Sequence, residues 1–198
     1  MRILIVSDTH KKIARVIEIY NKLAASSQVD LIIHCGDYYE DAMKIEKRLG
    51  KRVVAVRGNC DGCFDENEFR IVETEAGNFF ICHGHMDDAK HSKQGLYYHA
   101  LEENCVGAIF GHTHRAGKTE LDDFIFINPG SITKPRDGSG GSFAILDTAR
   151  DYKYARILKY EDFMASGSVP PMPPSSSSEK PKVSGGFLRR IFNYSDGQ

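Results

Sequence analysis

The sequence lacks an apolar run long enough to cross a lipid bilayer. Its first ten residues, MRILIVSDTH, hold only a short apolar stretch before Ser7 and Asp8. That stretch is shorter than the apolar region of a secretory signal peptide, and much shorter than the roughly 20 residues of a membrane span. We therefore predict a cytoplasmic protein without a transmembrane segment.

The sequence also lacks a surplus of charge. Its 26 lysine and arginine residues are balanced by 27 aspartate and glutamate residues, so the formal net charge at pH 7 is −1. A protein that is drawn to nucleic acid or to an anionic membrane by its overall field carries a clear positive surplus. The composition therefore gives no strong sign of nucleic-acid binding.

Cysteine is scarce, and its odd count of five does not form a disulfide framework. Cys60 and Cys63 form a single CxxC motif. A redox pair would need a thioredoxin-like setting, and a structural zinc site would need a second such pair. We interpret these two thiols as neighbours of a site built for other chemistry.

The composition changes abruptly near Ala165. The 198 residues suit one domain with a sizeable core and an appendage. From residue 165 the chain is rich in proline, serine and glycine, and it ends in the apolar-basic tip FLRRIFNYSDGQ. We predict a folded domain over 1–164 and a flexible tail over 165–198. The tip is either disordered or a short amphipathic helix that contacts a partner or a membrane surface.

Short apolar runs alternate with helical patterns in the first half of the predicted domain. Six runs rich in valine, isoleucine and phenylalanine predict buried strands: RILIVSD, LIIHCGD, VVAVRGN, NFFICHG, VGAIFGH and FIFINPGS. Apolar spacing predicts helices over 13–23, 41–49 and about 94–104. The later strands follow one another, and DYKYARILKY is a candidate closing strand. We therefore predict an α/β fold in which two sheets pack as a sandwich with helices outside.

The predicted strands end in side chains that can bind metal ions. In chain order they are Asp8, His10, Asp37, Asn59, His83, His85, His112 and His114. A single Gly-Asp or Gly-Asn pair is typical of an ordinary turn, but here polar ends recur after five strands. Ligands of α/β sheets bind beyond the carboxyl ends of the strands, and residues two apart share a face. We therefore predict that these side chains form one cluster.

The residue types in this cluster favour transition metals. Carboxylate, amide and imidazole ligands without thiolate suit manganese, iron, cobalt, nickel or zinc better than calcium. Two ions about 3.5–4 Å apart can hold a nucleophilic hydroxide between them and clamp a phosphoryl group. Asn59 would add a carbonyl ligand without a charge that repels phosphate, and Gly58 is expected to let the backbone turn tightly.

The motifs, in this order, resemble the calcineurin-like metallophosphoesterase superfamily. The matching segments are DTH at 8–10, GD at 36–37, GNCD at 58–61, HGH at 83–85, GHTH at 111–114 and NPGS at 128–131. The resemblance covers about residues 1–160 and is greatest to the small bacterial and archaeal single-domain phosphodiesterases. It implies a four-layer αββα sandwich with two mixed β-sheets flanked by helices.

The resemblance also implies a role for each residue. One divalent ion would be bound by Asp8, His10 and His114. The other would be bound by Asn59, His83 and His112, with Asp37 bridging the two. Manganese is the expected metal, with nickel, iron, cobalt or zinc as alternatives. Asp61 and His85 are the candidate catalytic residues: Asp61 would orient a neighbour or a water, and His85 would support the ligands or touch the substrate.

Cys60 departs from the family pattern, because many members carry a histidine there that donates a proton to the leaving group. The reference pKa of a thiol, about 8.5, makes it a weaker acid near neutrality than imidazole at roughly 6.5. We therefore expect a phosphodiesterase that attacks a small diester with a metal-bridging hydroxide. Lys134 and Arg136 are candidate phosphate contacts. The alternatives are a nuclease or phosphomonoesterase of the same fold, or a non-catalytic interaction scaffold.

Overall fold

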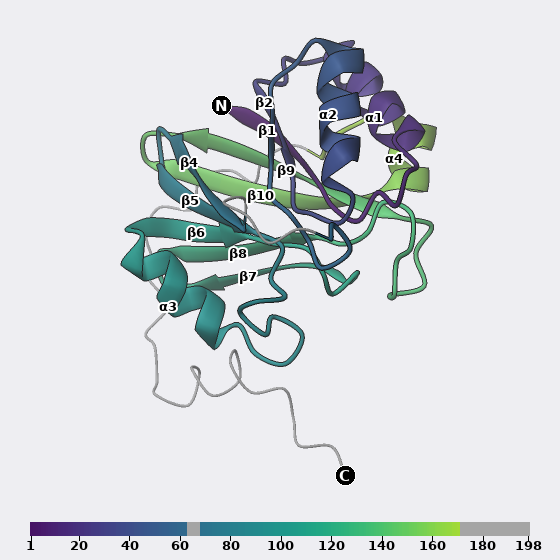
Figure 1. The fold of residues 1–198 in the computed structure, drawn as a ribbon. Coiled ribbons are helices and arrows are strands. Elements are labelled where there is room, and N and C mark those ends of the chain that lie inside the picture. Colours follow the sequence, from purple (N-terminus) through teal and green to yellow (C-terminus); the bar gives the residue numbers. More distant parts are fainter. Residues whose placement is uncertain (63–67, 171–198) are drawn as a thin grey trace.

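The computed structural model describes residues 1–62 and 68–170. Cys63 and the predicted tip of the tail lie outside the described residues. The described strands are β1 (Arg2–Val6), β2 (Leu31–His34), β3 (Val53–Ala55), β4 (Phe69–Thr74), β5 (Gly77–Cys82), β6 (Cys105–Ile109), β7 (Ala116–Leu121), β8 (Phe124–Pro129), β9 (Ser142–Ala149) and β10 (Tyr152–Lys159). The described helices are α1 (Ala14–Ala24), α2 (Tyr39–Leu49), α3 (Gln94–Glu102) and α4 (Tyr160–Ser166) (Figure 1).

The strands form two mixed five-stranded sheets. The first has the order β10-β9-β1-β2-β3, and the second has the order β4-β5-β6-β8-β7. Strands β1, β2 and β3 run parallel, as do β5, β6 and β8. The antiparallel neighbours are β9 and β10 in the first sheet and β4 and β7 in the second. Each sheet therefore has three parallel strands whose carboxyl ends lie at one edge.

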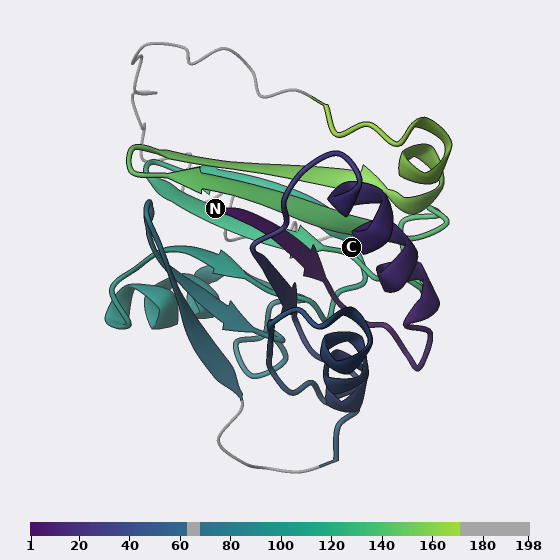
Figure 2. The same ribbon diagram turned by 90° about the horizontal axis from the view of Figure 1, so that it is seen from above.

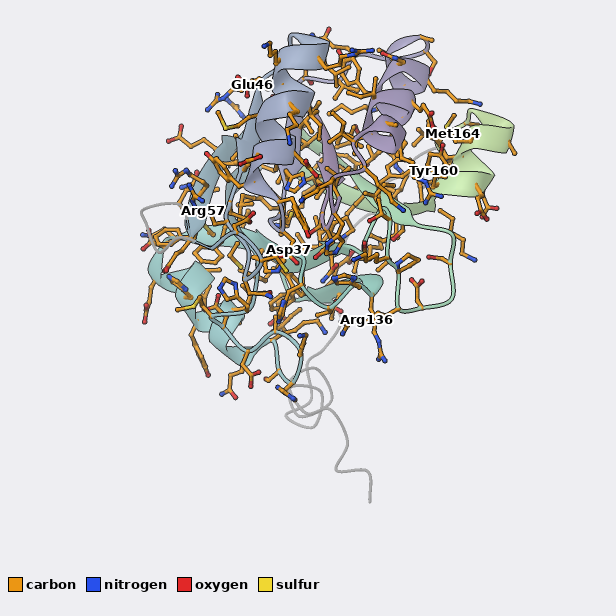
Figure 3. The ribbon with its side chains drawn as sticks, turned by 45° about the vertical axis from the view of Figure 1, so that its right-hand side comes forward. Asp37, Glu46, Arg57, Arg136, Tyr160 and Met164 are labelled. Carbon is orange, nitrogen blue, oxygen red and sulfur yellow. The ribbon has the colours of Figure 1, made fainter. Side chains whose placement is uncertain are left out.

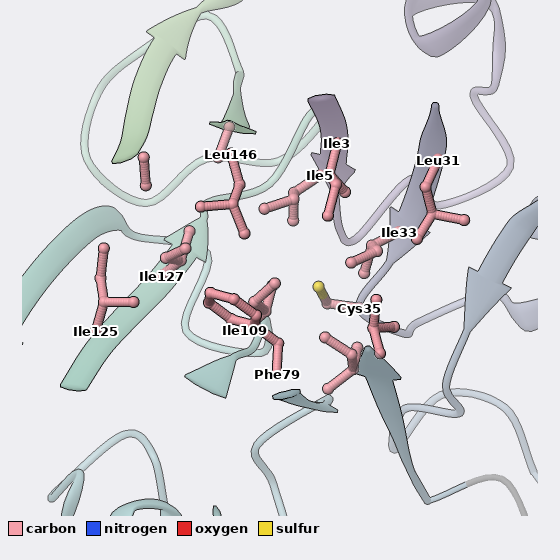
Figure 4. Packing of buried hydrophobic residues seen from close by; sticks show 14 of the residues in the cluster. Ile3, Ile5, Leu31, Ile33, Cys35, Phe79, Ile109, Ile125, Ile127 and Leu146 are labelled. Atoms are coloured by element: carbon pink, nitrogen blue, oxygen red, sulfur yellow. The ribbon is translucent and has the colours of Figure 1, made fainter. Parts of the chain in front are cut away.

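Three apolar clusters hold four layers together. Between the sheets, Ile5 and Ile33 of the first sheet pack in one cluster with Phe79 and Ile109 of the second (Figure 4). A second cluster joins the outer face of the first sheet to α1, α2 and α4, and a third joins the second sheet to α3. Helices therefore cover opposite sides of the paired sheets (Figure 2). Strands buried on both faces explain the continuous apolar runs, and the predicted αββα sandwich is confirmed.

The predicted helices are present, with small shifts at their ends. In α1 the buried residues Val16, Ile19, Tyr20 and Leu23 follow helical spacing. Helix α2 ends at Leu49 and is capped by Gly50, whose φ of 62° is the left-handed conformation that glycine adopts readily. No helix within residues 1–62 and 68–170 is long and apolar enough to cross a membrane.

Helix α4 is a short element that the sequence patterns do not predict. Its Phe163 is fully buried against the first sheet. The predicted division at residue 164 lies inside this helix, which continues to Ser166. Beyond it, the Pro170 carbonyl accepts a hydrogen bond of 2.9 Å from the Arg156 guanidinium. Described contacts to the fold therefore extend past residue 164, and the division into domain and tail stays a prediction.

Candidate metal centre

The loops after the parallel strands meet at one edge of the sandwich. Within the first sheet, the Asp8 backbone N–H donates to the Gly36 carbonyl at 3.2 Å. Within the second sheet, the Gly111 N–H donates to the His83 carbonyl at 3.1 Å. The two sheets are joined where Nδ1 of His83 lies 2.7 Å from the Cys35 carbonyl. Strand ends that are far apart in the sequence are thus fixed to one another by short polar contacts.

Four of the predicted ligands form a compact group. Ligand atoms of Asp8, His10, Asp37 and His114 all lie within 4.8 Å of one another. Nδ1 of His114 donates to the Lys134 carbonyl at 2.7 Å, so Nε2 of a neutral ring presents its lone pair, 3.1 Å from Asp8 Oδ1. These are the residues that the family resemblance assigns to one ion and its bridging ligand.

A second group surrounds His83. Because its Nδ1 donates to the Cys35 carbonyl, Nε2 presents a lone pair when the ring is neutral. That nitrogen lies 3.2 Å from Asn59 Oδ1 and 3.3 Å from Asp37 Oδ1. The ring of His112 lies 5.0 Å from the ring of His83, centre to centre. Three electron-rich atoms therefore face one another, an arrangement that a cation between them would stabilise.

This donor set fits divalent transition ions. Asp8 is fully buried, yet neither of its carboxylate oxygens accepts a hydrogen bond from the described residues. A buried carboxylate without such bonds is costly unless a cation compensates it. Nε2 of His10 is also buried without a hydrogen-bond partner among these residues. Burial lowers the pKa of His10, and that of His112 to about 4, which keeps both rings in the neutral form that binds metals.

The backbone is left-handed at five of the seven predicted ligands. Their φ angles are 54° at Asp8, 45° at His10, 56° at Asp37, 64° at His112 and 58° at His114. Non-glycine residues rarely adopt this region, and they do so mainly where the surrounding structure enforces it. Here the side-chain hydroxyls of Ser131 and Thr133 hold the loop by donating to the Asp8 carbonyl at 3.0 and 3.1 Å.

Gly58 lies at a turn and in close packing. The Asp61 N–H donates to the Gly58 carbonyl at 3.1 Å, which closes the turn, although the φ of Gly58 is not positive. A Cβ at this position would lie 2.3 Å from Asp37 Oδ1 and 3.0 Å from His83 Nε2. Glycine therefore allows the backbone to approach the ligands on both sides of the centre.

Asp61 and Cys60 complete the loop that carries Asn59. Asp61 accepts two backbone hydrogen bonds of 2.7 Å, from Tyr39 N–H on Oδ1 and from Gly58 N–H on Oδ2. This carboxylate thus ties the loop to the start of α2, and its catalytic role stays a prediction. The Cys60 N–H donates to Asp37 Oδ1 at 3.1 Å. Burial, together with the Asp37 carboxylate, raises the pKa of the Cys60 thiol to about 11.

His85 lies beside the second group. Its ring centre is 5.4 Å from that of His83 and 6.0 Å from that of His112. Its Nδ1 is buried without a hydrogen-bond partner within residues 1–62 and 68–170. The structure therefore brings His85 to the cluster, and its role stays a prediction.

A buried network beneath the site was missed by sequence reasoning. The Thr9 hydroxyl donates to Asp41 Oδ2 at 2.7 Å and lies 3.1 Å from Nε2 of the fully buried His34. Thr9 stands between Asp8 and His10, so this network fixes the segment that carries both ligands. The available signal was a histidine ending the apolar run LIIH, since a buried imidazole needs a polar partner.

Sequence comparisons identify a protein family and curated relatives that this chain resembles. A family model described as the calcineurin-like phosphoesterase superfamily domain matches residues 1–151. A probable metallophosphoesterase of Bacillus subtilis is 33% identical over 157 residues, which cover 79% of this chain and 90% of that protein. A phosphodiesterase of Methanocaldococcus jannaschii is 34% identical over 178 residues, covering 80% of this chain and 99% of that protein.

Solved structures show the same architecture. A predicted phosphoesterase of Streptococcus pneumoniae superposes with a TM-score of 0.67 at 26% identity, covering 81% of this chain and 90% of that one. Vps29 of Entamoeba histolytica in complex with zinc gives a TM-score of 0.64 at 19% identity, covering 81% and 99%. The second likeness concerns the fold alone. With the family model matching 1–151, these findings show that the chain belongs to the calcineurin-like phosphoesterase superfamily.

Proposed function

We propose that this protein is a metal-dependent phosphodiesterase that hydrolyses a small phosphodiester. The observation that carries the proposal is that Asp8, His10, Asp37 and His114 lie together, around a buried Asp8 whose oxygens accept no hydrogen bond from the described residues. The other three predicted ligands, Asn59, His83 and His112, form the adjoining group that Asp37 also contacts. The phosphodiesterase name of the archaeal relative supports the choice of a diester. A thiol at position 60, where many family members have histidine, supports poor activity on monoesters.

The proposed cofactor is a pair of divalent ions. Asp8, His10 and His114 would hold one ion, Asn59, His83 and His112 the other, and Asp37 would contact both. Manganese is the proposed metal, with nickel, iron, cobalt or zinc as alternatives. When bound, the ions would supply a hydroxide nucleophile at neutral pH and positive charge opposite the phosphoryl oxygens.

The chain's own residues would orient the substrate and determine whether the leaving group receives a proton. Lys134 and Arg136 are exposed on the loop after Ser131, and the Lys134 carbonyl also holds His114. Their cationic side chains can bind phosphate oxygens beside the metal ligands. A thiol, whose reference pKa is about 8.5, is a weaker proton donor near neutrality than the imidazolium of histidine, so Cys60 would give a basic leaving group little help. We therefore propose a preference for diesters whose leaving group is itself stable as an anion.

The test uses protein loaded with manganese and checked by elemental analysis. We expect hydrolysis of bis(para-nitrophenyl) phosphate to exceed that of para-nitrophenyl phosphate, and Asp37→Ala to lose nearly all activity with the metal. Full turnover by a chelated sample that elemental analysis shows to be free of metal would contradict the proposal. A preference for the monoester or for nucleic acid would instead favour the alternative enzymes of this fold.

A non-catalytic scaffold of this fold would have no need for the complete ligand set. All seven predicted ligands are present and lie together, which favours an enzyme. Turnover decides this point, because a scaffold would hydrolyse none of these phosphoesters even if it retained stoichiometric metal.

A further inference from the structure

A cavity of about 390 Å³ lies beside the candidate metal centre. Its walls come from the segment before α3, from β7 and β8, and from the loop that follows β6. The buried rings of Phe110 and Phe126 form an apolar part of the lining. Sites for small molecules in proteins have volumes of about 300–1,000 Å³, so this cavity has room for part of a substrate. We call it the cationic pocket.

Four positive side chains line the cationic pocket: Lys90, Lys93, Arg115 and Arg136. Within residues 1–62 and 68–170, none of the four forms an ion pair with a carboxylate. The acid next to Arg136 in the chain, Asp137, accepts a hydrogen bond from the Ser139 N–H instead. Like charges that face one cavity repel one another, so a bound anion would relieve their repulsion.

The cationic pocket adjoins the metal centre through one loop. Thr113 lines the pocket, and its two neighbours in the chain, His112 and His114, are predicted metal ligands. Consecutive Cα atoms are about 3.8 Å apart, so the pocket begins within one residue of the centre. The Arg136 N–H donates to the His114 carbonyl at 2.9 Å, and Figure 3 shows Arg136 below and to the right of Asp37. The pocket and the metal centre therefore share the loop that carries His112 and His114.

We propose that the cationic pocket binds a second phosphate group of the substrate. The substrate class is then a small phosphodiester, such as a nucleotide diester, that carries at least one further phosphate. A phosphate dianion neutralises more of the pocket's charge than a carboxylate, and arginine matches its oxygens with paired N–H groups. This inference rests on the proposed function, because it places the scissile diester at the metal centre.

The test compares two chromogenic substrates on the metal-loaded full-length chain. One is a para-nitrophenyl nucleotide diester, and the other is the same compound with one further phosphate on its sugar. In the wild type, the phosphorylated compound is expected to have a kcat/KM at least about tenfold higher, mainly through a lower KM. The double variant Lys90→Gln/Lys93→Gln is expected to lower that ratio about fivefold or more.

Lys118→Gln is the matched control. This lysine lies on β7, but it pairs with Glu120 at 3.4 Å and is not part of the pocket lining. Its replacement removes one positive charge from the same strand that helps to form the pocket. The ratio of kcat/KM between the two substrates is expected to stay at its wild-type value.

The outcomes separate this inference from the proposed function. A wild-type ratio near one, or a ratio that the double variant leaves unchanged, would overturn the second phosphate site while hydrolysis stands. If the metal-loaded wild type cleaves neither diester, the proposed function fails. Titration calorimetry then tests whether the cationic pocket binds a second phosphate group. A nucleoside bisphosphate should bind more tightly than the monophosphate, and the double variant should remove the difference. Equal binding of the two by the wild type would refute the site.

Discussion

Gly58→Ala should disable the metal centre without unfolding the protein. The added methyl group would lie 2.3 Å from Asp37 Oδ1, 2.5 Å from the Asp37 backbone nitrogen and 3.0 Å from His83 Nε2. Rotation of the Asp37 carboxylate relieves only the first of these contacts. Because the backbone nitrogen is equally close, the loop that carries Asn59 and the segment that carries Asp37 must move apart.

The size of the effect follows from that movement. Non-bonded carbon contacts are most favourable at about 3.5–4.0 Å, so a separation of 2.5 Å must grow by roughly 1 Å. A displacement of about 1 Å in a catalytic group can lower turnover by about 10²-fold. Loss of the support around metal ligands typically weakens metal binding by about 10–100-fold. We expect both losses together, because Gly58 touches the ligand that the two ions would share.

Metal content and turnover are measured on the same samples. Wild type and Gly58→Ala are dialysed against limiting manganese, analysed for metal, and assayed on an aryl diester. Gly117→Ala is the control, because a methyl group there meets no atom within 4 Å and the φ of Gly117 is not left-handed. Gly117 lines the cationic pocket, so the diester used in this assay carries no second phosphate. Circular dichroism establishes that each variant is folded. Stoichiometric metal in Gly58→Ala, with turnover within about threefold of wild type, would refute the reasoning.

Three further predictions concern the surroundings of the site and the first sheet. Cys60→Ser should change the turnover of an aryl diester by less than about tenfold in steady-state kinetics, and a loss above about a hundredfold would show that the thiol takes part. Asp41→Ala removes the acceptor of the Thr9 hydroxyl, and urea denaturation should show a free energy of unfolding lower by about 1–3 kcal/mol. Burial raises the pKa of Asp147, but the hydrogen bonds and positive charges of Arg2 and Arg156 outweigh that effect and hold the pKa below the ordinary 3.8. The ionised carboxylate therefore stabilises the fold above that value, and this stabilisation is lost as pH falls through the lowered pKa. Asp147→Asn should have a lower free energy of unfolding than wild type near neutral pH, and should lose less of it on acidification. Urea denaturation of both proteins at neutral and at acidic pH measures this.

The parallel strands could be predicted from the sequence because both of their faces are buried. Strands β1, β2 and β6 consist almost wholly of buried apolar residues, so each reads as a continuous run. Strand β7, with the sequence AGKTEL, lies at the edge of its sheet and has a single buried residue, so it has no apolar pattern to detect. Helix α4 has only seven residues, which is too short for helical periodicity to be recognised.

Strand β9 was missed for a different reason. Seven of its eight residues are buried, and it lies between β1 and β10 in the first sheet. Its sequence, SFAILDTA, follows a glycine-rich loop and mixes serine, aspartate and threonine with the apolar residues. Those polar side chains are satisfied by partners distant in the sequence, as where Asp147 binds Arg2 at 2.7 Å. Such pairing depends on the register of neighbouring strands, which local patterns do not specify.

The members of the site could be predicted better than their contacts. Residue types and their order at strand ends sufficed to predict which side chains lie together, and their role as metal ligands stays a prediction. The supporting contacts come from elsewhere in the fold: Asp61 uses both oxygens on backbone groups, and Asp41 of α2 holds Thr9 of the first loop. These partners depend on how helices and strands pack, so no short motif reveals them.

The strained backbone gives an independent reason to regard this cluster as functional. Among the described residues, ten other than glycine have positive φ, and five of them are predicted ligands. A left-handed conformation costs a residue with a side chain roughly 1–2 kcal/mol, and a domain's whole stability is only about 5–15 kcal/mol. Such conformations persist where the surroundings enforce them, as the hydroxyls of Ser131 and Thr133 do at Asp8. The fold therefore holds the residues predicted to bind metal in backbone conformations that they would not prefer on their own. Such departures from local preference are expected at functional sites.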